Sequence, residues 1–480
     1  MTDLLQLALD EATRLGATYA DARWVSYRRQ RLGTEDERVS GISDSEDTGL
    51  GVRVLAKGAW GFAATGEVTR DEVLRIARQA VAIAEASATA MKRPVTLVPE
   101  PARRETFRTP YEVDPFTIGI DQKAGLLLQI NRELLKHGAR KAHGFMTFKK
   151  DHRLFASTEG SLLESEVFTS AVGYQATATN SNDARTRAYF PPPLTAGYEN
   201  VNAADLLAQA PRVAEQATQQ LTAKECPVGR TNLILDPNNL ALTIHESVGH
   251  ATELDRALGM EESLAGRSFA TPDKLRNLQY GSENVNLVAD NTLPHGLATH
   301  GFDDDGVAGQ RWSIVEDGLF VGYGTSREVA GEIDLERSNG TCRADHWGSV
   351  PIVRIPNLSL MPGRKPLTLE ELIGDTDEGI YIEGMGSFSI DQMRCNFQFG
   401  GDACWEVKKG KVVGMLKNVT YQSMTTDFWN SCDAVCDERF WVQNGVLNCG
   451  KGDPIQISQM SHGAAPARFR NVAVGGAKSR

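Results

Sequence analysis

His245, Glu246 and His250 lie within the six-residue segment 245–250 (HESVGH) and are the residues best suited to metal chemistry. Two imidazoles on one side of a helix form a common pair of zinc ligands. A bound zinc ion lowers the pKa of its water, and a glutamate beside the first histidine can accept the proton and pass it to a leaving amine. The segment therefore predicts a zinc-dependent peptidase with Glu246 as general base.

The spacing of the two histidines differs from the familiar motif H-E-x-x-H, because one more residue separates them. In a regular α-helix this spacing rotates the second histidine by roughly 140° away from the first. A π-type bulge, or unwinding at Gly249, would realign the two imidazoles. We therefore expect one of these distortions. The alternative is a pair of structural histidines that only hydrogen-bond to neighbours.

A zinc ion needs at least one further protein ligand. Glu253 and Asp255 follow His250 closely and could be ligands or could orient a histidine. Cys449 lies between glycines that let the backbone approach a site closely. Cys432 and Cys436 could bind metal together, although their spacing favours a packed pair on one helix face.

Other residues with potential chemistry are Asp303–Asp305, His462, His295 and His300. The three aspartates could hold a cation such as calcium, but a solvated acidic turn before a glycine is the favoured interpretation. His462 could polarise a substrate carbonyl or orient a peptide, although a lone histidine is more often structural. We expect His295 and His300 to be loop residues.

The elements that must position the histidines can be predicted from the residues before them. Residues 231–236 read as a strand, and Asp236-Pro237 supplies an N-cap followed by proline at the first helical position. A helix over 238–248 would then carry the first histidine.

The whole chain predicts an α+β fold: an N-terminal mixed α/β layered domain (1–225) and a β-rich C-terminal domain (226–480) that carries the metal-site helix. Helices are expected over 4–15, 69–86, 120–137 and 203–223. Strands are expected over 19–27, 49–55, 149–156, 160–169, 171–180, 313–323, 379–383 and 404–421, and the proline-rich residues 95–120 should connect units.

Composition narrows the class of protein. The chain has 480 residues and a formal net charge of −11. Its seven cysteines are scattered along the sequence and do not form the pattern of a secreted disulfide framework. The acidic balance makes direct nucleic-acid binding a poor hypothesis. The N-terminus reads as an amphipathic helix and not as a signal peptide, and no apolar run approaches the roughly 20 residues of a membrane span. We expect a cytoplasmic protein that does not bind membranes.

Several stretches resemble the TldD/PmbA metallopeptidase family. The resemblance rests on the H-E-x-x-x-H segment together with stretches that occur in family order: 49–55 with 58–62, 304–307 with 309–310, 323–327, 461–463 and 468–472. It covers nearly the whole chain. Because it has the histidine motif, the chain resembles the catalytic, TldD-type members.

The resemblance implies a zinc ion whose third ligand is a cysteine near the C-terminus, a position that only Cys449 matches. Glu253 would then not bind zinc itself but would contact one of the zinc ligands. The resemblance also implies a homodimer, or a heterodimer with a PmbA-type subunit, around a cavity that admits unfolded peptides. The peptide would be held by adding a strand to an exposed sheet edge.

Two further functions compete with a peptidase. In the first, zinc only stabilises a non-catalytic subunit of a regulatory complex of the gyrase-modulator type. In the second, the protein is a nucleic-acid-associated regulator, which the acidic charge does not support. Glu246 separates the peptidase from a structural zinc site, because a structural site needs no general base and is closed by a fourth ligand.

Overall fold

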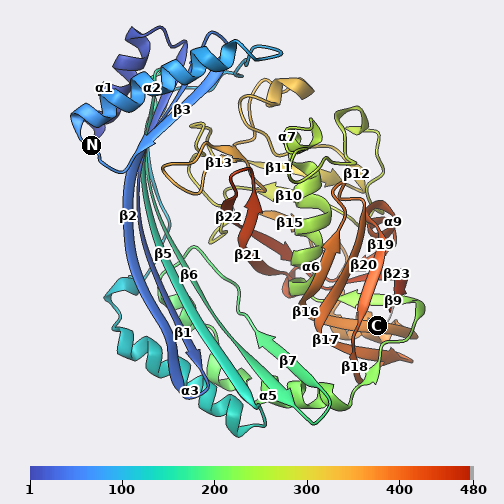
Figure 1. The fold of residues 1–480 in the computed structure, drawn as a ribbon. Coiled ribbons are helices and arrows are strands. Elements are labelled where there is room, and N and C mark those ends of the chain that lie inside the picture. Colours follow the sequence, from blue (N-terminus) through green and yellow to red (C-terminus); the bar gives the residue numbers. More distant parts are fainter. Residues whose placement is uncertain (476–480) are drawn as a thin grey trace.

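The computed structural model describes residues 1–475 and has the mixed α/β fold that the sequence predicts. Long strands of the N-terminal half form a curved sheet, and the C-terminal half lies on its concave side (Figure 1). No helix of the described residues is both long and apolar enough to cross a membrane.

A seven-stranded sheet is the framework of the N-terminal half. Its strands are β1 (Tyr19–Glu35), β2 (Arg38–Ala56), β3 (Ala59–Thr65), β4 (Arg104–Arg108), β5 (Lys141–Ser157), β6 (Leu162–Thr179) and β7 (Ala184–Tyr189). They lie in the order β3-β2-β1-β5-β6-β4, with β7 also paired to β6. All pairs are antiparallel except β4 with β6.

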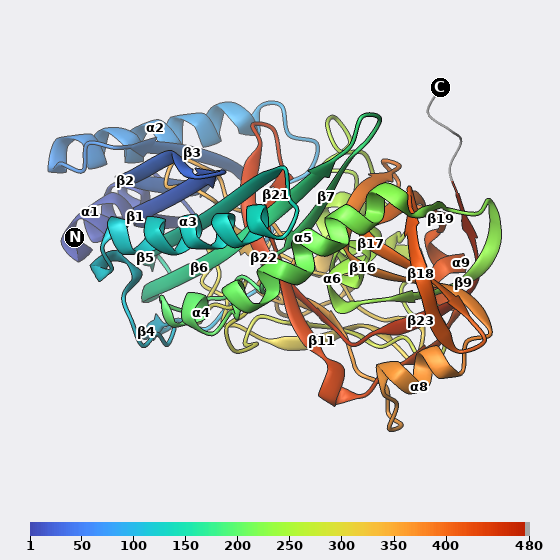
Figure 2. The ribbon, with the colours of Figure 1, turned by 90° about the horizontal axis from the view of Figure 1, so that it is seen from below.

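Helices cover one face of this sheet in two groups. Helices α1 (Thr2–Arg14) and α2 (Arg70–Ala88) share an apolar core with β1, β2 and β3. Helices α3 (Ile120–Lys136), α4 (Glu199–Asn202) and α5 (Leu206–Thr222) share a second core with β5 and β6. Figure 2 shows α3 and α5 lying along the strands. Successive side chains of a strand point to opposite faces, so the other face remains for the C-terminal half.

The C-terminal half is built mainly from strands. Its largest sheet runs in the order β16-β9-β23-β19-β17-β18-β8, with β20 paired to β23. These strands are β8 (Lys224–Glu225), β9 (Gly229–Leu235), β16 (Glu378–Ile390), β17 (Asn396–Lys408), β18 (Lys411–Lys417), β19 (Thr420–Met424), β20 (Cys432–Val435) and β23 (Ala467–Val474). Because β16 also pairs with β17, the strands β16, β9, β23, β19 and β17 close into a ring.

Smaller sheets and helices complete this half around one large apolar core. The remaining strands are β10 (Leu287–Asp290), β11 (Arg311–Glu316), β12 (Leu319–Phe320), β13 (Cys342–Arg343), β14 (Ile352–Val353), β15 (Leu358–Leu360), β21 (Val442–Lys451) and β22 (Gln456–Ala464). The helices are α6 (Pro237–Ile244), α7 (Leu254–Ala257), α8 (Leu369–Gly374) and α9 (Thr425–Asn430). Figure 1 places α6 in the middle of this half.

Several predicted elements differ from the observed ones. The short strands predicted over 19–27 and 49–55 belong to the long hairpin β1–β2. Its residues 38–47 are exposed and, apart from Val39, Gly41 and Ile42, polar, so they give little apolar signal. The two strands predicted over 160–169 and 171–180 form the single strand β6. The connecting region 95–120 contributes β4 to the sheet. Cys432 and Cys436 are buried in the core as expected, but Cys432 begins strand β20, so the predicted helix is wrong.

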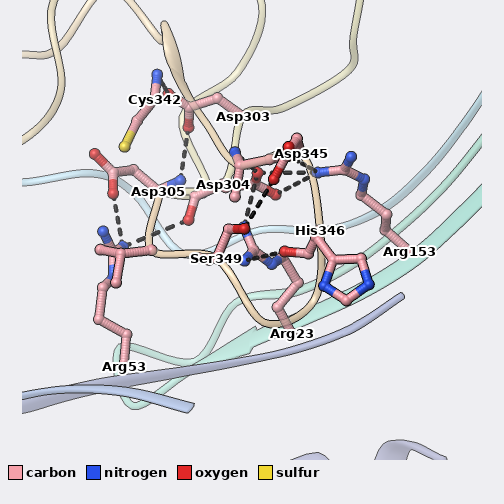
Figure 3. A network of polar contacts seen from close by, with 12 residues as sticks. Arg23, Arg53, Arg153, Asp303, Asp304, Asp305, Cys342, Asp345, His346 and Ser349 are labelled. Carbon is pink, nitrogen blue, oxygen red and sulfur yellow. Dashed lines mark hydrogen bonds and ion pairs between the residues drawn. The ribbon is translucent and has the colours of Figure 1, made fainter. Parts of the chain in front are cut away.

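The acidic run Asp303–Asp305 is buried and is not the solvated turn that we predicted. Asp304 lies 2.8 Å from Arg23 and 2.9 Å from Arg153, and Asp305 lies 2.7 Å from Arg53 (Figure 3). These arginines belong to β1, β5 and β2 and approach the run from the N-terminal sheet. These ion pairs therefore join the two halves of the molecule. They also replace the water that would solvate the carboxylates in a surface turn.

Candidate metal centre

Helix α6 begins and ends as its sequence requires. The side chain of Asp236 accepts a hydrogen bond from the Asn239 amide, 2.7 Å away, and Pro237 occupies the first helical position. The helix then widens into one π-helical turn over His245–Gly249 and tightens into a 3-10 turn over His250–Thr252. The predicted distortion is confirmed as a π-turn, which turns both imidazoles to the same side: their ring centres lie 4.9 Å apart.

Gly249 is needed for space and not for backbone freedom. Its φ of −52° is ordinary right-handed helix, so the predicted unwinding there does not occur. A Cβ at this position would lie only 2.9 Å from the side chain of Ile355, which is fully buried. The glycine therefore lets the wide turn pack directly on the core.

His462 holds His245 in one tautomer. The Nδ1 of His462 lies 2.9 Å from the carbonyl of Leu358, which can only accept, so Nδ1 carries the proton. Burial, with a further contribution from His245, lowers the pKa of His462 well below its ordinary value, so its Nε2 is an acceptor. The Nδ1–H of His245 donates to that Nε2 at 2.9 Å, which leaves Nε2 of His245 free for a metal.

Glu253 does the same for His250. Its carboxylate accepts from Nδ1 of His250 at 2.8 Å, which directs Nε2 of His250 towards Cys449. Burial alone would raise the pKa of Glu253, but Lys451 and His250 outweigh it and hold the pKa below its usual range. Lys451 lies 3.3 Å from Glu253 and 2.8 Å from Asp255, and all three are buried. Asp255 is thus engaged by Lys451 and does not join the cluster of ligand atoms.

A bulge in β21 aims Cys449 at the histidines. Strand β21 pairs Val446 with Met460 and Cys449 with Ser458, so it contains one more residue than β22 between these pairs. Such a bulge re-aims the side chain that follows it. Arg354 is buried and donates to the Cys449 carbonyl, fixing the hairpin. Burial alone would raise the pKa of the Cys449 thiol, but His250 and Arg354 lower it below its ordinary value, which favours a thiolate.

The geometry of these three residues fits a zinc ion. One ligand atom each from His245, His250 and Cys449 lies within 4.8 Å of the others, and Cys449 Sγ is 3.4 Å from His250 Nε2. Ligands of a tetrahedral zinc ion, bound at about 2.0–2.3 Å, lie roughly 3.3–3.8 Å from one another. Two neutral imidazoles and a thiolate also match the donors that zinc prefers.

Glu246 lies beside this cluster and is held by an arginine. Arg394, in the turn between β16 and β17, donates to Glu246 Oε2 at 2.6 Å. The other oxygen, Oε1, accepts no hydrogen bond from the described residues. Burial raises the pKa of Glu246, but His245, His250 and Arg394 outweigh it, so the pKa lies below its usual value. The side chain is therefore a fixed carboxylate with one free oxygen.

Glu246 and the three cluster residues face a cavity of about 1340 Å³ between the two halves of the molecule. The N-terminal sheet contributes residues of β1, β2, β5 and β6, and the C-terminal half contributes residues 385–390 and 445–450. His462 is fully buried behind His245, so the hypothesis that it contacts substrate is replaced by a positioning role. His295 and His300 lie in loops, as predicted.

Sequence reasoning missed three charged residues at this site: Arg394, Arg354 and Lys451. Lys451 follows Cys449 by two residues on the same strand, and that alternation could have placed it on the same face. Arg394 and Arg354 belong to no recognisable motif, and only the fold brings them near the cluster.

Comparison with known proteins identifies the family. Residues 228–476, more than half of the chain, match the PmbA/TldA metallopeptidase C-terminal domain, and residues 20–84 match PmbA/TldA metallopeptidase domain 1. The chain belongs to the PmbA/TldA metallopeptidase family. All residues of the candidate centre lie within the first of these matches.

Relatives of this PmbA/TldA family member include named metalloproteases. A metalloprotease of Methanocaldococcus jannaschii is 28% identical over 439 residues, which are 90% of this chain and 92% of that protein. The zinc metalloprotease TldD homolog of Saccharolobus solfataricus is 22% identical over 473 residues, covering 98% of this chain and 99% of the relative.

Solved structures share the fold of this family member. A Thermotoga maritima protein named as a modulator of a DNA gyrase superposes with a TM-score of 0.78 at 16% identity, over 99% of this chain and 100% of that one. TldE from Thermococcus kodakarensis superposes with a TM-score of 0.74 at 16% identity, over 98% of this chain and 100% of that one.

Proposed function

We propose that this chain is a zinc-dependent peptidase that hydrolyses unfolded or flexible peptides. The observation that carries the proposal is the gathering of His245, His250 and Cys449 beside Glu246 on the wall of one cavity. A structural zinc site is closed by four protein ligands, whereas a catalytic site has three and an open position. Within residues 1–475 the cluster contains three candidate ligands, which favours catalysis.

Each residue of the centre then has a chemical task. Zinc, when bound by His245, His250 and Cys449, supplies Lewis-acid chemistry that activates water and polarises a peptide carbonyl. Glu246 accepts the proton of the attacking water on its free Oε1 and delivers it to the leaving amine. Arg394 keeps Glu246 in place through Oε2. His462 and Glu253 keep the two imidazoles in the tautomer that exposes Nε2.

The cavity supports an extended peptide as substrate. Strand β21 pairs only with β22 among the described strands, so no strand covers its other edge along residues 445–450, which line the cavity. A peptide can add to such an edge through main-chain hydrogen bonds, a mode that reads little side-chain sequence. A folded protein has few free strands to offer, and flexible chains are therefore the proposed substrates.

We propose further that the chain works as a dimer, either with a second copy or with a PmbA-type subunit. Its structural likeness to TldE and its match to the PmbA/TldA domains support a partnership of this kind. Analytical ultracentrifugation of the protein alone, and then mixed with a PmbA-type protein, distinguishes the two assemblies. A monomer under both conditions would contradict the proposal.

The substitution Glu246→Gln tests the peptidase. Zinc-loaded wild type should cleave a quenched fluorescent, unstructured peptide, and a chelator should stop the reaction until zinc is returned. Glu246→Gln should keep its zinc content and thermal stability but lose at least about 100-fold in kcat, because the proton acceptor is absent. If Glu246→Gln cleaves as fast as wild type, Glu246 is not the base. If zinc-loaded wild type does not cleave the peptide, the non-catalytic, zinc-stabilised subunit becomes the better hypothesis.

A further inference from the structure

A second, smaller cavity adjoins the main one. Its volume is about 310 Å³, and it lies between the concave face of the N-terminal sheet and loops of the C-terminal half. The two cavities share Arg31, Thr147, Leu447 and Gln459 in their walls. Leu447 belongs to the bulge that precedes Cys449. A peptide bound at the candidate centre could therefore reach into the smaller cavity.

Five cationic side chains line this cavity, together with the carboxylates Asp151, Asp303, Asp304 and Asp345. The cationic side chains are Arg29, Arg31, Lys149, Arg153 and Arg343. Lys149 and Arg153 contact Asp151, at 2.9 Å each. The other three, Arg29, Arg31 and Arg343, contact no carboxylate of residues 1–475 within ion-pair distance, so their charges are available to a ligand.

The carboxylates that line the cavity already have partners. Asp304 is paired with Arg23 and Arg153. Asp303 accepts from three backbone amides. Asp345 accepts from the Ser349 hydroxyl and the Ile457 amide, both at 2.8 Å. Among the described residues, none of these carboxylates lies within ion-pair distance of Arg29, Arg31 or Arg343.

Strand pairing brings two of the cations together. Arg29 on β1 lies directly opposite Lys149 on β5. Both lie over the ring of Tyr27, at 5.0 Å and 4.7 Å from its centre. Like charges directly opposite each other destabilise a sheet. Asp151, 2.9 Å from Lys149, already offsets part of this repulsion, and an anion bound between Arg29 and Lys149 would offset more of it.

Arg343 closes the opposite side of the cavity. It is partly buried, and its guanidinium donates to the carbonyls of Gln459 and Ile355, at 3.0 Å and 2.6 Å. Burial, together with the neighbouring Arg354 and Arg153, lowers the pKa of Arg343 to about 9. A partly buried charge whose contacts are neutral is poorly compensated, and a bound anion would compensate it.

We propose that this smaller cavity, lined by Arg29, Arg31, Lys149 and Arg343, binds a carboxylate of the peptide substrate. The inference rests on the proposed peptidase function. The carboxylate is either an acidic side chain or the C-terminus of the peptide, and guanidinium groups recognise both through paired hydrogen bonds. The cavity thus acts as a specificity site, which selects peptides that present such a carboxylate when they are bound at the candidate centre.

The test uses zinc-loaded enzyme and a series of otherwise neutral, flexible peptides. One aspartate is moved along the sequence and compared with asparagine at each position, and each peptide is made with a free or an amidated C-terminus. We expect aspartate at one position, or the free C-terminus, to raise kcat/KM by about ten-fold, as one charge-assisted hydrogen bond would. The aspartate arm and the amide arm distinguish the two sources of carboxylate.

The double variant Arg29→Gln/Arg31→Gln should remove this preference, measured as the ratio of kcat/KM between peptides with and without the preferred carboxylate. Arg29→Lys/Arg31→Lys keeps the charge and should keep part of the preference. Arg132→Gln is the matched control, because Arg132 is exposed on α3, outside both cavities. Equal rates both for aspartate and asparagine peptides and for free and amidated C-termini, or a preference that survives in the double variant, would overturn the inference and leave the peptidase intact.

Binding to the Glu246→Gln variant separates this inference from the proposed function. Fluorescence anisotropy should show acidic peptides binding about ten-fold more tightly than neutral ones, and the added Arg29→Gln/Arg31→Gln changes should abolish the difference. If wild type cleaves nothing but this difference appears, the peptidase proposal fails and the carboxylate site stands. If binding shows no difference, the carboxylate site is wrong.

Discussion

At the scale of single residues, the candidate centre depends on which atom each side chain presents. His245 and His250 each use Nδ1 to donate to a neighbour, His462 or Glu253, so that Nε2 faces the cluster. Cys449 presents a thiol whose pKa is lowered below its ordinary value. These contacts present Nε2 of both histidines and the Cys449 sulfur to one another, which is the arrangement that a shared metal ion requires.

Cys449→Ser should weaken zinc binding by more than about 100-fold, because a serine hydroxyl stays protonated where a thiolate would bind. Zinc competition with a chromogenic chelator measures the affinity. Cys432→Ser and Cys436→Ser are the controls, since both thiols lie in the apolar core. They should retain zinc, and full zinc occupancy in Cys449→Ser would exclude Cys449 as a ligand.

His462→Phe should lower zinc affinity by about 10–100-fold, because Nδ1–H of His245 loses its acceptor and the tautomer is no longer fixed. His462→Gln, whose amide oxygen can still accept, should restore part of the affinity. The readout is the zinc dissociation constant by competition, with thermal unfolding of the zinc-free proteins as a check of folding. Unchanged affinity in His462→Phe would show that the histidine is only part of the core.

At the scale of elements, one extra residue appears in each of the two segments that carry candidate ligands. The π-turn over His245–Gly249 adds a residue to a helical turn, and the bulge before Cys449 adds a residue to a strand. Both insertions rotate a side chain that regular geometry would point elsewhere. In both segments the irregular backbone places the side chain of a candidate ligand.

Gly249→Ala tests the packing of the π-turn. The added methyl group would clash with Ile355, so the turn must shift. We expect this shift to lower the free energy of unfolding by about 1–3 kcal/mol and to weaken zinc binding through His250. The second change Ile355→Val removes the closest methyl group and should recover part of both losses. Denaturant unfolding and zinc competition measure them. If the double variant recovers neither loss, the backbone conformation of Gly249 matters and the space beside Ile355 does not.

At the scale of the whole molecule, the cavity exists because two distant parts of the chain hold each other. The arginines of β1, β2 and β5 meet the buried run Asp303–Asp305 (Figure 3), and the main cavity lies between the same two parts. The ion pairs fix the distance between the N-terminal sheet and the centre. The division of the chain near residue 225 stays a prediction.

Asp304→Asn should destabilise the protein by about 3–5 kcal/mol, because Arg23 and Arg153 remain buried with less compensating charge. Urea unfolding followed by tryptophan fluorescence measures the change. The control is Glu262→Gln, since the pair Arg267–Glu262 is 56% and 57% exposed and should contribute less than about 1 kcal/mol. Similar losses in both variants would refute a special role for the buried pairs.

The sequence by itself determined what is local. The six residues 245–250 required a distorted helix, and Asp236-Pro237 marked where that helix starts. Local pattern suffices there because capping and helical periodicity act within a few residues. The cysteine came from a family resemblance, and its spacing alone left several alternatives open.

Only the tertiary structure decided what depends on distant partners. The run Asp303–Asp305 reads as a surface turn in sequence, yet it is buried because arginines about 150–280 residues earlier supply the opposite charge. Arg394 reaches Glu246 across 148 residues, and the aim of Cys449 depends on a bulge that only strand pairing reveals. Charge compensation and strand register are set by neighbours in space, which is why the sequence could name candidate ligands but could not show how they are arranged.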